Sequence, residues 1–185
     1  MGHSQAEKAA THERVLRIAS RKIREDGMSR PGVAEIMQEA GLTHGGFYKH
    51  FASREDLIAQ AATAALTEGS AQIEDLAGKS EQDRRTGLID TYLSKEHRDS
   101  PGIGCALVTL GAAAGRGDET LKEAYEKRVR DYLSRFGGND SEEARAEAML
   151  TLSALVGATL IARAVADPCL SDELLETVAQ QLTRH

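Results

Sequence analysis

Residues 33–58 read VAEIMQEAGLTHGGFYKHFASREDLI, and this stretch decides the fold. Apolar residues recur at helical spacing on both sides of Gly41, so the stretch predicts two short helices, residues 33–40 and 44–50, joined by a tight turn. Neither helix is long enough to be stable alone. We therefore expect a helix-turn-helix whose apolar side chains pack against flanking helices, namely Val33, Ile36, Met37, Leu42, Phe47 and Phe51.

Helices are also predicted on both sides of this pair. The segment 11–26 carries an apolar stripe and ends at Gly27, and the first ten residues are expected to form a polar, mobile arm. Ser53 and the acidic residues after it predict the start of a helix that continues to about residue 77. Capping residues and glycine or proline breaks predict further helices, one beginning near residue 80 and others spanning 103–114, 118–136, 141–166 and 170–183.

Composition and charge distribution limit the fold class and the cellular compartment that we expect. Aromatic residues make up only 4% of the chain and no stretch alternates with period two, so we expect an all-α fold of about nine helices. The net charge is −6, but residues 1–60 carry a net charge of +1 and residues 61–185 a net charge of −7, which leaves the N-terminal part free to present a positive face. No secretory segment opens the chain and the two cysteines form no CxxC motif, so we expect a cytoplasmic protein. The apolar run 148–166 contains several polar residues and is interpreted as a buried helix.

The polar side chains around the second short helix have the chemistry of a DNA-binding surface. Residues 43–46 stand at its N-terminus, where a recognition helix reaches base edges, and the two glycines let the backbone approach closely. The phenol, amine and imidazole of residues 48–50 suit phosphates, as does the guanidinium that follows. On spacing alone, a polar helical corner in a protein unrelated to DNA explains the segment as well. The candidate DNA-binding residues are Thr43, His44, Gly45, Gly46, Tyr48, Lys49, His50 and Arg54.

Residues 12–60 resemble the DNA-binding domain of the TetR family of bacterial regulators. The resemblance rests on a first helix ending in REDG, followed by VAEIMQEAGLTHGGFYKHFASREDLI. It implies that Tyr48, His50 and Arg54 contact phosphates, that residues 43–46 face the major groove, and that a ligand cavity lies within residues 60–185. Pro31-Gly32 stands where the family usually has two threonines, so one hydroxyl contact to phosphate is expected to be missing.

We therefore assign residues 1–52 to an arm and a helix-turn-helix DNA-binding domain, and residues 53–185 to a helical effector-binding and dimerisation domain. The expected function is that of a repressor released from double-stranded operator DNA by a small-molecule or electrophilic effector, with no cofactor and no metal. The last two helices have wide apolar faces that suit a homodimer interface, although the same residues could complete the core of one subunit. These residues are Leu152, Leu155, Val156, Leu160, Leu174, Leu175, Val178 and Leu182.

Cys105 follows the break at Pro101 and resembles in position a cysteine of family members that respond to electrophiles or oxidants. A thiol near a helix start can react as thiolate, but no basic partner is identifiable in the sequence, so burial as a small apolar residue explains Cys105 better. A thiol-based redox protein or a helical enzyme centred on Cys105 is therefore kept as an alternative function. Cys169 is expected to be structural, and His97, with its charged neighbours, is expected to be solvated.

Overall fold

The computed structural model describes residues 5–68 and 80–184, and every regular element within these ranges is helical. The N-terminal part contains α1 (Gln5–Asp26), α2 (Val33–Glu39), the 3-10 helix η1 (His44–Lys49) and α3 (Arg54–Thr67). The all-α prediction and the short helical pair on either side of Gly41 are therefore confirmed.

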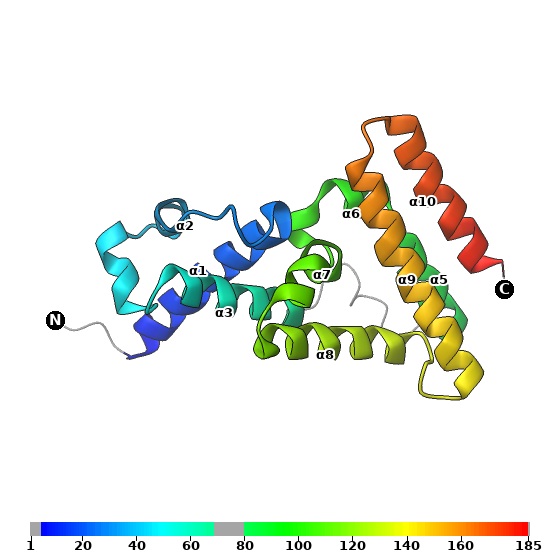
Figure 1. The fold of residues 1–185 in the computed structure, drawn as a ribbon, viewed down its shortest axis with the longest axis horizontal. Coiled ribbons are helices and arrows are strands. Elements are labelled where there is room, and N and C mark those ends of the chain that lie inside the picture. Colours follow the sequence, from blue (N-terminus) through cyan, green and yellow to red (C-terminus); the bar gives the residue numbers. More distant parts are fainter. Residues whose placement is uncertain (1–4, 69–79, 185) are drawn as a thin grey trace.

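The C-terminal part is a longer series of helices. It contains α5 (Glu81–Tyr92), α6 (Lys95–Asp99), the 3-10 turn η2 (Pro101–Ile103), α7 (Ala106–Arg116), α8 (Glu119–Arg135), α9 (Glu142–Ala164) and α10 (Pro168–Thr183). Figure 1 shows α2 and η1 at one end of the molecule, the α9–α10 pair at the other, and α7 and α8 between them. The segment that carries the candidate DNA-binding residues is thus far from the last two helices.

Short polar side chains begin the helices as the sequence predicts. The Ser53 hydroxyl accepts a hydrogen bond from the Asp56 amide, the Ser80 hydroxyl accepts one from Asp83, and the Asp118 carboxylate accepts one from Leu121. Gly27 and Gly41 have φ of 78° and 71°, the left-handed region that ends a helix most easily with glycine.

Several predicted boundaries were wrong. α1 begins at Gln5, so residues 5–10 are helical rather than part of a mobile arm; this segment, QAEKAA, consists of good helix formers. α3 ends at Thr67, and the rest of its predicted span lies outside the described residues. α7 begins at Ala106 because residues 101–103 form a separate 3-10 turn, and α10 begins at Pro168, whose fixed φ suits a first helical position.

The α9–α10 pair contributes to the core of the subunit more than the sequence alone indicates. Leu152, Leu155 and Leu175 are buried within one chain, so the prediction that they meet a second subunit was wrong for these three. Leu160, however, is 51% exposed. By length and composition α9 could also cross a membrane, a test that core helices of soluble proteins pass as well.

His97 is buried, contrary to the expectation that it is solvated. Its Nδ1 lies 2.6 Å from the Tyr92 carbonyl oxygen, and its Nε2 accepts a hydrogen bond of 2.9 Å from the Cys105 amide. Gly104 leaves room for the ring, because a Cβ there would lie 2.8 Å from Nε2. The neutral imidazole therefore joins the end of α5 to the start of α7.

This arrangement predicts a loss of stability in acid. Burial lowers the pKa of His97 from 6.5 to about 4, so as the pH falls the unfolded chain takes up this proton before the folded chain does. The stability that the neutral ring provides is present above pH 6.5 and declines towards pH 4. We expect the melting temperature of His97→Gln to fall less between pH 7 and 4 than that of the wild type. His44→Gln, at an exposed position, is the control, and an equal decline in His97→Gln and wild type would contradict the prediction.

Candidate nucleic-acid interface

The α2–η1 pair is held to the rest of the domain by its apolar side. Ile36, Met37, Phe47 and Phe51 are buried, and the Phe47 and Phe51 rings stack with centroids 5.6 Å apart. The turn between the helices is closed by a hydrogen bond of 2.8 Å from the Leu42 amide to the Met37 carbonyl. Because the apolar residues face inward, the polar residues of η1 are left on the surface.

Ion pairs fix α2 against α1 as well. Glu39 accepts a hydrogen bond of 2.6 Å from the Arg21 guanidinium and lies 3.4 Å from the Lys22 ammonium, which also pairs with Glu35. Each of these surface pairs is worth little alone, but together they add rigidity to the angle between α1 and α2. The direction in which η1 points is therefore set by both apolar and charged contacts.

The side chains of η1 and its N-cap project outward. Thr43, His44, Gly45 and Lys49 are exposed, and Tyr48, at 71% exposure, is the most exposed large hydrophobic residue within the described ranges. A Cβ built at Gly45 would meet no atom within 4 Å, so nothing inside the subunit requires a glycine there. The absence of a side chain at this position instead suits the close approach of another molecule.

The N-terminal half of α1 adds residues to this surface that sequence reasoning missed. Lys8 and Thr11 line a cleft of about 620 Å³ together with Thr43, Tyr48 and Lys49. His12, one turn further, stacks on Phe51 with ring centroids 4.5 Å apart. The signal that could have located them is the helix-forming composition of residues 5–10, which carries α1 towards η1.

His50 is half-buried between η1 and α1. Its Nδ1 is buried with no hydrogen-bond partner, and its ring centroid lies 6.4 Å from that of His12. Burial, and then the neighbouring His12, Lys8 and Lys49, lower the pKa of His50 below 6.5. The ring is therefore mainly neutral at neutral pH, and an anion beside it would raise its affinity for a proton.

Arg54 lies in the first turn of α3, as predicted, but part of its guanidinium is already used. Its Nη2 donates to the carbonyl oxygens of Ser29 and Pro31, at 3.0 and 3.2 Å. Arg54 thus holds the loop that leads into α2. The Gly32 that precedes α2 provides no side-chain cap. The loss of a hydroxyl contact to phosphate at this point stays a prediction.

The apolar side of the α2–η1 pair is buried, and its polar side faces outward. This arrangement is that of a helix-turn-helix DNA-binding domain. Residues 15–61 match the bacterial regulatory proteins of the tetR family. Residues 15–61 therefore form a DNA-binding domain of the kind found in this family of regulators. Comparison with curated proteins finds no relative.

Solved structures extend the likeness of fold to the whole chain. A TetR transcriptional regulator from Chloroflexus aurantiacus is 19% identical, with a TM-score of 0.76 over 98% of both chains. The reduced form of Escherichia coli NemR is 19% identical, with a TM-score of 0.72 over 94% of this chain and 95% of that one. A TetR-family regulator from Agrobacterium tumefaciens is also 19% identical, with a TM-score of 0.73 over 95% and 97%. At these identities the likeness shows the fold alone.

Proposed function

We propose that the chain is a cytoplasmic repressor that binds operator DNA as a homodimer and leaves it when a small-molecule effector binds residues 53–185. The observation that carries the proposal is the outward polar face of η1 on a buried, ion-paired scaffold. The proposal includes no catalysis. Release would occur if the effector favoured a dimer whose two recognition segments no longer match the half-sites, which lie about 34 Å apart.

Within this proposal the candidate residues divide by chemistry. Residues 43–46 would lie in the major groove, where the exposed Thr43 and His44 reach base edges and Gly45 admits the backbone. Tyr48, Lys49 and His50 would hold phosphates, joined by Lys8 from α1. Arg54 would place a positive charge near the phosphates of the DNA backbone while it holds the loop before α2.

The direct test is an electrophoretic mobility shift with the promoter region of the chain's own gene, at 50 and 200 mM salt. Because the contacts are largely to phosphates, we expect binding at low salt that weakens by a factor of about 10³ or more at the higher salt. Unrelated DNA of equal length is the control. Failure to shift the promoter DNA at low salt would count against DNA binding by this face.

The exposed apolar stripe of α9 supports the homodimer. Met149, Leu150, Leu160 and Ile161 are each more than 40% exposed, and a Cβ at Gly157 would meet no atom within 4 Å. These positions recur at helical spacing along one face, with the exposed Ser153 and the open Gly157 between the two apolar pairs. Two copies related by a twofold axis would cover it, with the apolar parts of α10 alongside.

DNA binding should depend on pH through His50. Phosphates near the ring would raise its lowered pKa, so the complex takes up a proton and affinity rises as the pH falls through the region below about 6.5. We expect the dissociation constant, measured at constant salt between pH 8 and 5.5, to fall with pH in the wild type and less steeply in His50→Gln. His97→Gln, which removes a histidine far from η1, is the control. An identical pH slope in His50→Gln would exclude this role.

An observation at Cys105 favours a reactive thiol as the means of effector sensing. The thiol is buried at the start of α7. The Tyr92 and Tyr132 hydroxyls are buried, have no hydrogen-bond partner among the described residues, and interact electrostatically with Cys105. Two phenols near one sulfur place proton donors beside the reacting atom. On addition to an electrophilic alkene, the sulfur would bond to the β-carbon and the proton would pass to the α-carbon.

The thiol hypothesis predicts a specific loss. Cys105→Ser should bind operator DNA as the wild type does but remain bound when N-ethylmaleimide is added, whereas the wild type is released. Cys169→Ser, which removes the exposed cysteine, is the matched control and should be released like the wild type. Equal release of Cys105→Ser would remove Cys105 from the mechanism and leave the proposal of a non-covalent effector.

A further inference from the structure

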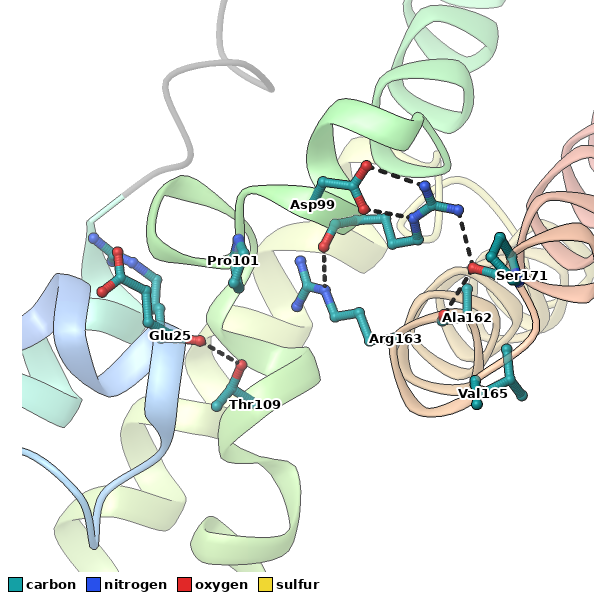
Figure 2. Close-up of a pocket in the computed structure, with 12 residues that line it drawn as sticks. Glu25, Asp99, Pro101, Thr109, Ala162, Arg163, Val165 and Ser171 are labelled. Atoms are coloured by element: carbon teal, nitrogen blue, oxygen red, sulfur yellow. Dashed lines mark hydrogen bonds and ion pairs between the residues drawn. The ribbon is translucent and has the colours of Figure 1, made fainter.

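A second candidate ligand site lies where the DNA-binding domain meets the last helices. A cleft of about 510 Å³ is lined on one side by the end of α1 and on the other by the end of α9 and the start of α10. Figure 2 shows Arg163 reaching from α9 into this region, with Asp99 and Pro101 beside it and Glu25 and Thr109 across from it. A volume of this size suits a small organic molecule.

The charges of the cleft do not balance. The Glu25 carboxylate is held by Arg21, and both Asp99 oxygens accept hydrogen bonds from Arg98, at 2.7 and 3.0 Å. Arg24 has a carboxylate partner in Glu68, 3.6 Å away. Arg163 differs, because no carboxylate of the described residues forms an ion pair with it. Asp99 acts on Arg163 only over a longer distance, so the Arg163 guanidinium has no anion in contact with it among the described residues.

The Arg163 guanidinium has one edge occupied and one edge free. Its Nε donates to the Arg98 carbonyl at 3.0 Å and its Nη2 to the His97 carbonyl at 2.6 Å, so this edge caps the end of α6. The opposite edge, formed by Nη1 and the second hydrogen of Nη2, has no protein partner among the described residues. Burial lowers the pKa of Arg163, a sign that water compensates its charge poorly. A guanidinium edge of this kind matches the two oxygens of a carboxylate.

We propose that this cleft binds a small organic carboxylate through the free edge of Arg163. The wall next to Arg163 includes Val165, Ala166 and Pro168, which offer apolar contacts to a short alkyl chain attached to the carboxylate. The Asp99 carboxylate pairs with Arg98, which also pairs with Asp172, so part of its charge opposes that of a bound anion.

The site is placed to influence the DNA-binding domain. The Thr109 hydroxyl donates to the Arg24 carbonyl at 2.9 Å, and the Arg24 Nε donates to the Gly102 carbonyl at 2.8 Å, so the last turn of α1 is tied to α7 and η2, which both contribute residues to the cleft. A carboxylate bound between α9 and α1 would stiffen this junction. An effect on operator affinity rests on the proposed function, whereas binding to the cleft does not.

Calorimetric titration and thermal melting of the full chain with butyrate, n-butanol and inorganic phosphate test the assignment. Butyrate should bind and raise the melting temperature, and n-butanol should not. Arg163→Lys should weaken butyrate binding by about tenfold, because a lysine keeps the charge but lacks the two-pronged edge. Arg116→Gln, an exposed arginine also in the last turn of its helix, should bind butyrate as the wild type does.

Ala166→Leu narrows the cleft while Arg163 stays in place, so it tests the site even if changes at Arg163 disturb α6. It should reduce butyrate binding. No butyrate binding by the wild type, or unchanged binding in Ala166→Leu, would overturn the proposal. Tighter binding of phosphate than of butyrate would overturn the carboxylate assignment. These titrations need no DNA, so their failure is distinguishable from a failure of operator binding.

Discussion

Leu160→Glu is expected to convert the protein from a dimer to a monomer and to lower its operator affinity by a factor of about 10²–10⁴. Leu160 lies in the exposed apolar stripe of α9, where a glutamate of one copy would be buried against apolar side chains of the other. In a dimer, binding of one subunit to its half-site holds the second subunit at a high local concentration near the other half-site. A monomer binds each half-site independently and loses this gain in affinity. Sedimentation and mobility shift of the same preparation measure both effects.

The control for this change is Ala112→Glu, an exposed alanine on α7 that receives the same side chain. It should remain dimeric and bind DNA normally. Because Leu160 is 51% exposed in the single chain, the glutamate should leave the helical content and the fold of each subunit intact. A dimeric Leu160→Glu protein with full affinity would show that this stripe is covered by something else.

Lys49→Ala should weaken operator binding by about 100-fold, about tenfold for each of the two subunits. Lys49 is exposed on η1 beside Tyr48 and close to Lys8 of α1, so its loss removes a phosphate contact without changing the core. The slope of log affinity against log salt should become shallower by about 2, since each subunit releases about one counterion fewer. Fluorescence anisotropy at four salt concentrations gives both quantities.

Lys127→Ala is the matched control, because Lys127 is an exposed lysine on α8, away from η1. It should keep both the affinity and the salt slope of the wild type. An affinity loss in Lys49→Ala with an unchanged slope would indicate that Lys49 positions η1 instead of contacting phosphate. Equal affinity of Lys49→Ala and wild type would exclude a phosphate contact by this residue.

The helix-turn-helix could be predicted closely because its signals are local. Gly41 is needed for a left-handed turn, Ser53 accepts a hydrogen bond from an amide three residues on, and Phe47 and Phe51 are one helical turn apart. Each feature acts within a few residues of the chain, so the sequence contains all the information that is required.

Features that depend on distant partners could not be predicted in the same way. His97 was expected to be solvated, but its imidazole lies between the carbonyl of Tyr92 and the amide of Cys105. Cys105 follows the η2 turn, and the sequence does not predict the direction in which this turn leads the chain. Likewise, the leucines of α9 have similar spacing, and only the placement of α8 and α10 decides that Leu155 is buried while Leu160 is not.

The sequence alone determines an all-helical chain with a short pair of helices at residues 33–50, because helix periodicity, caps and turn glycines act over short distances. The DNA-binding role of this pair was implied by the resemblance to a family and not by the spacing. Only the tertiary structure decides which apolar face remains uncovered, that Lys8 and His12 join η1, and that Arg163 has a free edge in a cleft beside α1. Burial and charge balance are sums over neighbours that are far apart in the chain. The burial of a side chain and the balance of charge around it are therefore fixed only when the helices have packed.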